Sequence, residues 1–220
     1  MDLARLPPAL TSVLSSDERT RAARILDGTR RELWARSRAA LRLLLAGQLG
    51  REPETIEFEH ARGRPRLRSN GPAPLCFGVS HSGAAALYAF GANGPVAVDL
   101  EMRRRPLRNE LQLARRAFGE GVAAQIAQLD GEARAHEFLR RWVRREAELK
   151  CRGEGIWGAL ASAGPQRPAG AEVWVSDLPS PSNGAFAAVA ADTRPTGVRY
   201  GQWDAASGVP QKIFTTSFCV

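Results

Sequence analysis

Apolar residues that recur every three to four positions predict helices in two parts of the chain. The expected helices lie at residues 16–27 and 31–49 in the first part, and at residues 107–118, 120–129 and 132–151 in the second. Ser16 comes directly before acidic residues, and it is the expected N-cap of the first helix. Between and after these helical parts the pattern of apolar residues changes.

Short apolar runs bounded by turn residues predict strands in the remaining segments. The expected strands lie at residues 55–59, 75–79, 84–90 and 95–101, and again at residues 172–176, 185–190 and 197–203. The GANG turn is expected to make a hairpin of residues 84–101. The sequence ARGRPRLRSNG, which follows the first of these strands, is expected to be a basic loop.

The order of these elements predicts the fold class. Each half of the chain runs helices first and antiparallel strands after, which predicts an α+β protein and is compatible with two similar subdomains. Each subdomain is expected to pack a small antiparallel sheet against its helices. The arginine run Arg103–Arg105 and Pro106 interrupt the pattern, so the expected domains are residues 1–105 and 106–220.

Composition narrows the class of protein. Hydrophobic residues make up 44% of the chain and charged residues 25%, as in soluble globular proteins. No apolar run approaches the about 20 residues of a membrane span, and the first residues lack the layout of a secretory signal. We therefore expect no membrane contact and a cytoplasmic location. Cys76, Cys151 and Cys219 lie far apart, which argues against a disulfide framework.

The formal net charge of +8 is carried almost entirely by arginine, with Lys150 and Lys212 as the two lysines. A basic surface attracts nucleic acid, anionic lipid, phosphorylated cofactors or acidic proteins. Arginine suits bidentate recognition of phosphate, but a biased genomic composition explains its abundance equally well. The charge therefore leaves the class of partner open.

Two acidic residues stand out on the strand VAVDLE. Because side chains alternate along a strand, Asp99 and Glu101 are expected to share one face, while Val98 and Leu100 point to the other. One interpretation is a solvated strand end. The other is a site for a hard metal ion, because magnesium takes carboxylate oxygens together with phosphate oxygens and water.

A second pair of charges lies on the expected helix 132–151. Its apolar stripe runs through Phe138 and Trp142, and the same spacing continues to Glu146 and Lys150. An exposed Glu–Lys pair would contribute only a few tenths of a kcal/mol. The inward stripe favours a functional interpretation instead, with Glu146 as a metal ligand or general base and Lys150 as a cation that neutralises phosphate charge.

Each of two glycine-containing motifs has either a purely structural interpretation or an interpretation as a ligand contact. GVSHSG, at residues 78–83, is either a capped turn with a surface histidine or a phosphate contact by His81 with Ser80 bonded to the ligand. It is not the GxSxG elbow of serine hydrolases, because its glycines have the wrong spacing. The stiff basic segment around Arg64 either is solvated or contacts phosphate or purine.

These motifs follow one another in a specific order: GRP, VSHSG, VAVDLE and WVRREAELKCRGEG, between about residues 63 and 156. In this order and spacing they resemble the 4'-phosphopantetheinyl transferase superfamily, in its single-chain surfactin-type branch. The segments SDERTRAAR and SRAALRLLL are also similar to the family. After about residue 160 only the strand-like texture agrees with it.

The resemblance implies a magnesium site and a general base. Asp99, Glu101 and Glu146 match the three acidic positions that bind magnesium in the family. Glu146 also matches the residue proposed to deprotonate the acceptor serine, directly or through water. Lys150 matches the lysine that contacts the phosphates of coenzyme A.

The resemblance also implies contacts to the nucleotide end of coenzyme A. His81 matches the histidine near the 3'-phosphate, with Ser80 as its neighbour at the nucleotide. Arg38 falls where the family places an arginine on the same phosphate, and Arg64 replaces the usual lysine near the adenine. Glu18 departs from the family pattern, because some relatives carry a phosphate-binding lysine there.

Taken together, the resemblance implies an enzyme that transfers the 4'-phosphopantetheine group of coenzyme A to a serine of an apo acyl or peptidyl carrier protein. Adenosine 3',5'-bisphosphate is the implied second product, magnesium the implied cofactor and coenzyme A the co-substrate. We expect a monomer with an internal pseudo-two-fold, a pseudo-dimer in one chain, and a ligand cleft between its subdomains. Two departures lie beside Glu146, where Val143 replaces serine or threonine and Arg145 replaces lysine.

Two other functions remain open from the sequence. A nucleic-acid-binding module would explain the charge, but the chain lacks interleaved aromatic motifs, zinc spacing and a recognisable basic helix. A catalytically inactive relative that only binds carrier proteins is the second alternative, and the three intact acidic residues argue against it. We expect no nucleic acid among the partners. The sequence does not choose between carriers of fatty acid, polyketide and non-ribosomal peptide synthesis.

Overall fold

The computed structural model describes residues 1–61, 64–68, 75–92, 94–103, 109–154, 172–180, 184–203 and 210–217, without the side chains of 61, 64 and 210–217. By its internal contacts the chain divides into two compact units. The first comprises Met1–Pro74, Gly83–Ala86 and Pro195–Val220, and the second comprises Leu75–Ser82 and Leu87–Arg194. The boundary expected at residues 105 and 106 lies outside the described residues, so the division into two similar subdomains stays a prediction.

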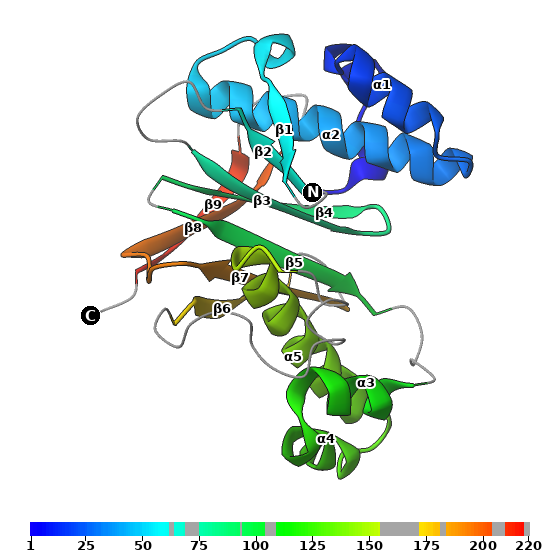
Figure 1. The fold of residues 1–220 in the computed structure, drawn as a ribbon, viewed down its shortest axis with the longest axis vertical. Coiled ribbons are helices and arrows are strands. Elements are labelled where there is room, and N and C mark those ends of the chain that lie inside the picture. The colour runs from blue at the N-terminus through cyan, green and yellow to red at the C-terminus, as the bar shows by residue number, and fades with distance from the viewer. Residues whose placement is uncertain are drawn as a thin grey trace. The chain divides into compact units, whose positions relative to one another are not determined.

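Reciprocal capping starts the first helix of the first unit (Figure 1). α1 (Ser16–Ala23) begins after Ser15, whose Oγ accepts a hydrogen bond from the Glu18 N–H at 3.3 Å. The Glu18 carboxylate accepts one in return from the Ser15 N–H at 3.0 Å. The expected N-cap, Ser16, is therefore wrong by one residue, because only Ser15 stands three residues before the N3 glutamate that completes a capping box.

A polar cap also moves the start of the second helix. α2 (Gly28–Leu49) begins earlier than the expected residue 31, because the Asp27 carboxylate accepts a hydrogen bond from the Arg30 N–H at 2.7 Å. It ends at Gly50, whose φ of 62° suits a glycine. The inner face of α2 buries Ala39 against the end of the short 3-10 helix η2 (Pro8–Val13).

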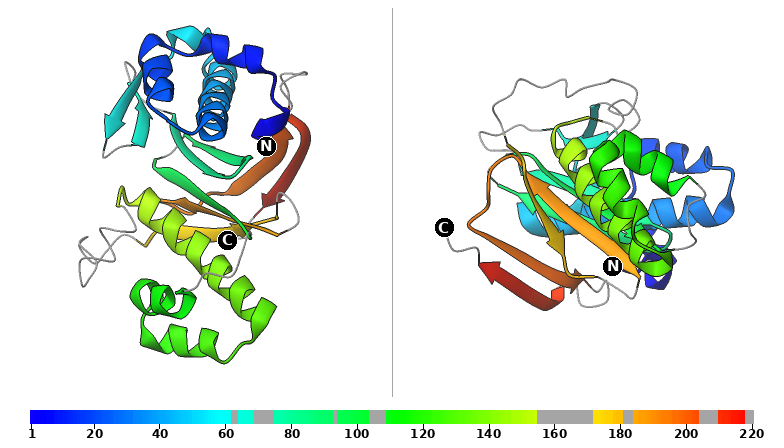
Figure 2. Two further views of the ribbon diagram at one scale, coloured as in Figure 1. Left: turned by 90° about the vertical axis from the view of Figure 1, so that its right-hand side faces the viewer. Right: turned by 90° about the horizontal axis from the view of Figure 1, so that it is seen from below.

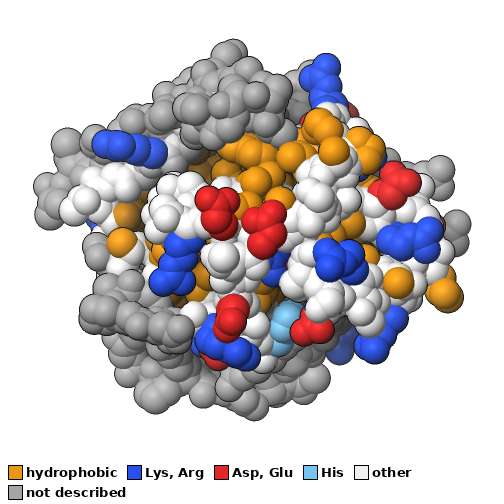
Figure 3. All heavy atoms as spheres, turned by 90° about the horizontal axis from the view of Figure 1, so that it is seen from above, with side chains coloured by type: hydrophobic (Ala, Val, Ile, Leu, Met, Phe, Trp, Pro, Cys, Tyr) orange, Lys and Arg blue, Asp and Glu red, His pale blue; other side chains and the backbone are white. Residues whose placement is uncertain are grey.

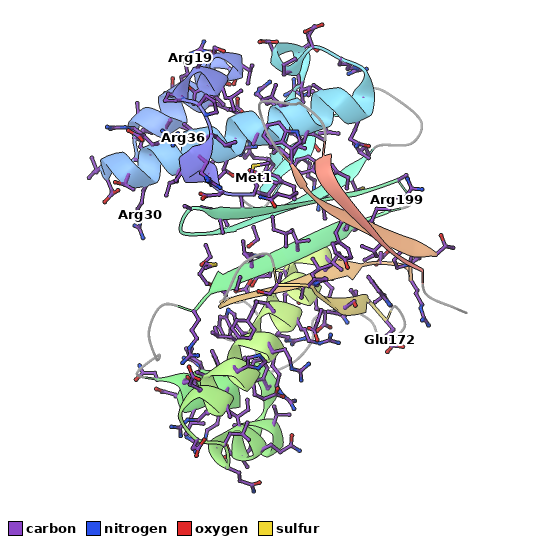
Figure 4. The ribbon with its side chains drawn as sticks, turned by 180° about the vertical axis from the view of Figure 1, so that it is seen from behind. Met1, Arg19, Arg30, Arg36, Glu172 and Arg199 are labelled. Carbon is purple, nitrogen blue, oxygen red and sulfur yellow. The ribbon has the colours of Figure 1, made fainter. Side chains whose placement is uncertain are left out.

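The N-terminal segment is held to the first unit by hydrogen bonds. The Met1 ammonium donates to the Ala86 carbonyl oxygen at 3.1 Å. Arg36 of α2 donates to the carbonyl oxygens of Leu3 and Ala4 at 3.3 and 3.0 Å. Figure 4 labels Met1, at the start of this segment, and Arg36 on α2. Leu3, in the 3-10 helix η1 (Leu3–Arg5), is fully buried as a result.

The strands of the first unit form two antiparallel pairs. These are β1 (Phe58–Ala61) with β2 (Arg64–Leu67), and β8 (Gly197–Trp203) with β9 (Pro210–Ser217). β1 starts later than the strand expected at residues 55–59, because the 3-10 helix η3 (Pro53–Thr55) precedes it. β2 lies where a basic loop was expected. Pro65 is tolerated there because both strands of a two-stranded sheet are edge strands.

A three-stranded antiparallel sheet and one helix form the core of the second unit (Figures 1 and 2). The sheet has the order β5–β7–β6, made of β5 (Val96–Met102), β7 (Ala185–Ala191) and β6 (Trp174–Leu178). α5 (Gly131–Cys151) lies across one face of the sheet, which it contacts through Val143, Ala147 and Cys151. These residues recur at i,i+4 spacing, and the facing β7 residues, such as Ala188, are small enough for close packing.

Two further helices pack beside the N-terminal half of α5. α3 (Glu110–Phe118) and α4 (Glu120–Ala127) share with α5 an apolar cluster centred on Phe138 and Ile126. Trp142 stacks on Phe138 with ring centroids 5.6 Å apart. The helices expected at residues 107–118, 120–129 and 132–151 are confirmed apart from small differences at their ends, and residues 107 and 108 lie outside the described residues. Mixed helices and small antiparallel sheets also confirm the α+β class.

The strand pairing before β5 differs from the prediction. β3 (Cys76–Ser82) and β4 (Ala85–Gly91) form a two-stranded sheet across a tight turn at Gly83, which has a φ of 60°. The hairpin expected over residues 84–101 is therefore wrong, because β4 pairs with β3 whereas β5 pairs with β7. Four consecutive residues of β5, 97–100, are buried. Such a strand needs cover on both faces, and a separate hairpin of residues 84–101 would leave one face of β5 uncovered.

Ion pairs of Glu137 with two arginines of α5 predict a pH-dependent stability, and one of these arginines, Arg140, also pairs with Asp177 of β6. Hydrogen bonds from Arg140 and then Arg141 lower the pKa of Glu137 from 4.5 to about 2. A carboxylate with a lowered pKa contributes stability that is fully present above its unfolded pKa and is lost as the pH falls toward 2. We expect Glu137→Gln to lower the free energy of unfolding by about 1 kcal/mol at pH 7, after discounting for solvent screening.

This difference should shrink as the pH falls below 4.5, in urea titrations of both proteins between pH 7 and pH 3. Glu120→Gln is the matched control, because Glu120 pairs with Arg115 at 3.2 Å on an exposed surface. That variant is expected to leave the free energy of unfolding nearly unchanged at every pH. A Glu137→Gln difference that stays constant over this range would contradict the prediction.

The composition predicted neither a membrane-spanning segment nor a disulfide framework. None of the helices in these ranges combines the length and the apolar character that crossing a bilayer requires. Neither Cys76 nor Cys151 belongs to a disulfide bond. Cys219 lies outside the described residues, as does the tail around it.

Candidate active site

Close contact between the backbones of β3 and β5 brings the serine-containing motif onto the acidic strand. A Cβ atom built on Gly78 of β3 would lie only 2.8 Å from the Cα atom of Ala97 in β5. No side chain fits in this space, so a glycine is needed for the two strands to approach. The residues that follow Gly78 on the same face of β3 therefore lie beside the carboxylates of β5.

Two serine hydroxyls of β3 bond the two carboxylates of β5. Ser80 Oγ donates to Asp99 Oδ1 at 2.9 Å and accepts from the Leu100 N–H at 3.2 Å. Ser82 Oγ repeats the pattern, because it donates to Glu101 Oε2 at 3.1 Å and accepts from the following backbone N–H at 3.1 Å. The prediction that Asp99 and Glu101 share one face is confirmed, since both carboxylates face β3.

Asp99 is a buried carboxylate, not part of a solvated strand end. The residue is only 3% exposed. Its Oδ1 accepts from Ser80 and from Lys150, whereas its Oδ2 is buried and has no hydrogen-bond partner among the described residues. A buried carboxylate oxygen without a partner carries a substantial desolvation cost. Asp99 is therefore arranged to accept one further donor or a cation.

The charged residues of α5 reach the same carboxylate. Lys150 Nζ lies 2.5 Å from Asp99 Oδ1 and 3.9 Å from Glu146 Oε2. The side chains of Lys150 and Glu146 are 23% and 15% exposed. The interpretation as an exposed Glu–Lys pair is wrong, because the lysine bonds a buried carboxylate on another element. Asp99 and Glu146 thus already share one cation, the ammonium group of Lys150.

His81 lies between the two serines on β3. Partial burial, followed by the positive charge of Lys150, lowers the pKa of His81 below its usual value of 6.5. The imidazole is therefore largely neutral at pH 7 in the absence of an anion. A bound phosphate would oppose both effects, because an adjacent negative charge favours the protonated form. The contact of His81 with a phosphate stays a prediction.

The donor set of the site suits a hard cation. In the ranges that the structure describes, no three His, Cys, Asp or Glu side chains form a ready-made metal group. The ligation of magnesium by Asp99, Glu101 and Glu146 therefore stays a prediction. Their chemistry fits this ion, because all three offer carboxylate oxygens and the Oδ2 atom of Asp99 has no hydrogen-bond partner among the described residues.

Part of the chain that includes the site is similar to a known family. The family model described as the 4'-phosphopantetheinyl transferase superfamily matches residues 95–198. These residues include Asp99, Glu101, Glu146 and Lys150, whereas Ser80 and His81 precede them. The match supports the superfamily that the order of the motifs implied.

Several similar proteins are named as 4'-phosphopantetheinyl transferases. The chain is 35% identical over 156 residues to the Synechocystis sp. protein slr0495, named provisionally as a 4'-phosphopantetheinyl transferase, with 70% of this chain and 63% of that protein covered. It is 36% identical over 149 residues to the 4'-phosphopantetheinyl transferase HetI of Nostoc sp., covering 67% and 62%. It is 35% identical over 130 residues to the 4'-phosphopantetheinyl transferase AcpT of Escherichia coli K12, covering 59% and 62%.

The chain spans less than two thirds of the length of each of these relatives. Their names refer to HetI and AcpT, so the surfactin-type branch within the superfamily stays a prediction. For the same reason, we treat the activity, substrates and partners of the whole protein as proposals.

The arginine that the superfamily resemblance assigns to a phosphate is buried in the first unit. Arg38 is 9% exposed, and its guanidinium carbon lies 5.5 Å from the Trp34 ring centroid and 5.1 Å from the Phe58 ring centroid. Its Nε lies 3.5 Å from a carboxylate oxygen of Glu18, which also pairs with Arg42 at 2.6 Å. Glu18, the departure from the family pattern, therefore holds two arginines of α2. The phosphate role of Arg38 stays a prediction.

One predicted site residue has a side chain that the structure does not describe, and two residues near the site were not predicted from the sequence. The side chain of Arg64 lies outside the described residues, although its backbone belongs to β2. Ser82 and Arg42 were missed at the sequence level. Ser82 had a usable signal, because the spacing of two between Ser80 and Ser82 equals that between the acidic residues of β5.

Proposed function

We propose that this chain is a 4'-phosphopantetheinyl transferase that moves the phosphopantetheine group of coenzyme A to a serine of an apo acyl or peptidyl carrier protein. Adenosine 3',5'-bisphosphate is the second product. The observation that carries the proposal is the meeting of Asp99, Glu146 and Lys150 within the segment that matches the superfamily. A buried acid, a second acid and a lysine form a site that suits phosphoryl transfer.

Magnesium is the proposed cofactor, held by carboxylate oxygens of Asp99, Glu101 and Glu146. When bound, it would withdraw charge from the reacting phosphate and orient it. The lysine would have to give up its bond to Asp99 in favour of an incoming phosphate. Its mostly buried position leaves it close to both acids and able to neutralise phosphate charge.

The proton transfer is proposed for Glu146. Its carboxylate takes the proton of the carrier serine hydroxyl, directly or through water, as the serine oxygen attacks the phosphorus that bears pantetheine. The bond between that phosphorus and the oxygen of the adenosine bisphosphate breaks, and the electron pair leaves with this oxygen. Lys150 neutralises the charge that develops on the leaving group.

The nucleotide end of coenzyme A is proposed to contact Arg38, Arg64 and His81, with Ser80 beside them. A monomer with a ligand cleft between two similar subdomains belongs to the same proposal. On the face shown in Figure 3, basic and acidic side chains of the described residues are interspersed. Among the described residues of that face, the basic side chains do not form a continuous surface of the kind that tracks a nucleic-acid backbone.

Mass spectrometry of a carrier protein tests the function directly. The chain is incubated with coenzyme A, magnesium and a panel of apo carrier proteins. Transfer adds about 340 Da to a carrier, the approximate mass of the arm moved in a phosphoryl transfer of this kind. Omitting either coenzyme A or magnesium should abolish the gain.

Two results would contradict the proposed function. One is no mass gain on any carrier of the panel. The other is binding to DNA that weakens steeply with salt, together with no effect of coenzyme A on the melting temperature, which would favour the nucleic-acid alternative. Carrier binding without mass gain would favour a catalytically inactive relative.

A further inference from the structure

The hydroxyls of Ser80 and Ser82 form two equivalent bridges between β3 and β5. Each donates to a carboxylate of β5, at 2.9 Å to Asp99 and at 3.1 Å to Glu101. Each also accepts from the backbone N–H of the residue that follows the carboxylate, at 3.2 and 3.1 Å. We propose that both serines are positioning residues that hold these two carboxylates in the orientation needed to bind a divalent cation. The inference rests on the proposed function, and it adds the groups that orient its metal ligands.

The hydrogen-bond chemistry of a hydroxyl makes the two bridges directional. A serine has one O–H donor and two acceptor lone pairs. Since a backbone N–H can only donate, the serine proton is left for the carboxylate. Each serine of β3 therefore links a carboxylate of β5 to the backbone of β5. This link restricts rotation of the acidic side chain. Groups that orient a ligand in this way tune metal binding without touching the metal.

The position of Ser80 also selects one oxygen of Asp99. Ser80 Oγ and Lys150 Nζ both bond Oδ1, and Oδ2 is buried with no hydrogen-bond partner among the described residues. The oxygen that remains for a cation is therefore Oδ2. Ser80 itself is 7% exposed, and its hydroxyl accepts from Lys150 at 3.4 Å in addition to the Leu100 N–H.

This arrangement separates two roles for the serine motif. The single proton of the Ser80 hydroxyl is bonded to a buried carboxylate, so this hydroxyl has no donor left for a phosphate or another acceptor of the nucleotide. The structure therefore favours a positioning role for Ser80 over the nucleotide contact that the resemblance implied. The same geometry gives Ser82 a role that the sequence did not indicate.

Ser82 is the better position for a test, because it is only partly buried and its replacement is less of a risk to folding than that of Ser80. Ser82→Ala removes the hydroxyl, and Ser82→Thr restores it. Ser176→Ala is the matched control, since Ser176 lies on β6 of the same unit, and among the described residues its Oγ donates to a backbone oxygen, that of Asp177, at 3.3 Å and to no carboxylate. Circular dichroism melting curves of the full chain establish that each variant is folded.

Two measurements are made on each protein. The first is the dissociation constant for Mn²⁺, titrated calorimetrically with coenzyme A present and no carrier protein. The second is the magnesium concentration that gives half-maximal transfer, alongside the KM for coenzyme A. We expect Ser82→Ala to raise both metal values by about 10-fold or more. The KM for coenzyme A should change by less than about 3-fold, Ser82→Thr should recover most of the loss, and Ser176→Ala should match the unmodified chain.

The possible results separate this inference from the proposed function. Unchanged Mn²⁺ affinity in Ser82→Ala would overturn the positioning role. A raised KM for coenzyme A with unchanged metal values would overturn it too, and would assign the serine to the nucleotide. The Mn²⁺ titration needs no turnover, so a chain that transfers nothing would refute the proposed function while the titration still decides the role of Ser82.

Discussion

Replacing Asp99 with asparagine is expected to reduce the kcat/KM of phosphopantetheine transfer by about a thousandfold. Asparagine keeps the shape of the side chain and an oxygen that can accept from Ser80. It removes the negative charge that faces Lys150 and turns one carboxylate oxygen into an amide nitrogen, which cannot bind a cation. The measurement is the initial rate of transfer to an apo carrier protein at saturating magnesium.

Controls for this prediction address folding, because Asp99 is almost fully buried and pairs with Lys150. Removing one partner of a buried ion pair costs about 3–5 kcal/mol in unfavourable cases. Glu101→Gln is the second variant, since Glu101 is only partly buried, and we expect a similar loss of transfer from it. Asp177→Asn, in the outer ion pairs of α5 and β6, should retain full activity. Near-normal transfer by folded Asp99→Asn and Glu101→Gln would refute the assigned site.

The second large effect is expected at Gly78. An added methyl group would lie 2.8 Å from the Ala97 Cα and 3.1 Å from two backbone atoms of β5. Neither strand can yield easily, because β5 is buried along residues 97–100 and is paired with β7. We expect Gly78→Ala to lower the free energy of unfolding by about 3 kcal/mol, as in other overpacked sites. Urea denaturation followed by tryptophan fluorescence measures this change.

A glycine without neighbours provides the control for that prediction. A Cβ atom on Gly121, in the first turn of α4, would meet nothing within 4 Å. Gly121→Ala should therefore leave stability unchanged or raise it by about 0.5 kcal/mol. Equal effects of the two substitutions would show that the backbones of β3 and β5 are not in close contact. The serine bridges would then lose their structural basis.

Helices were the part of the fold that could be predicted best. The pattern of apolar residues in 107–151 has the period of a helix, and each helix there buries one stripe of it. The ends of the helices were less predictable, because a cap is a hydrogen bond of one particular side chain, which the pattern of apolar residues does not show. Ser15 rather than Ser16 caps α1 for this reason, since two adjacent serines look alike until the partner Glu18 is placed.

Strand pairing was harder to predict than the strands themselves. Seven expected strands are present at nearly the expected residues, but β4 pairs with β3 and not with β5. The apolar run of β5 has the same composition whether it lies at an edge or at the centre of a core. Its pairing with β7 joins residues about 90 positions apart, and such long-range pairing depends on the packing of the whole unit.

The sequence by itself determined the candidate groups for the proposed chemistry: an acidic pair two residues apart, a Glu–Lys pair one helical turn apart, and a serine motif between glycines. Spacing within one strand or helix fixes which side chains share a face, so these sets are readable without coordinates. Only the tertiary structure decided that Lys150 bonds Asp99, and that Ser80 and Ser82 bond the two carboxylates. Those contacts join separate elements, and they form because Gly78 lets two backbones meet, which no local pattern encodes.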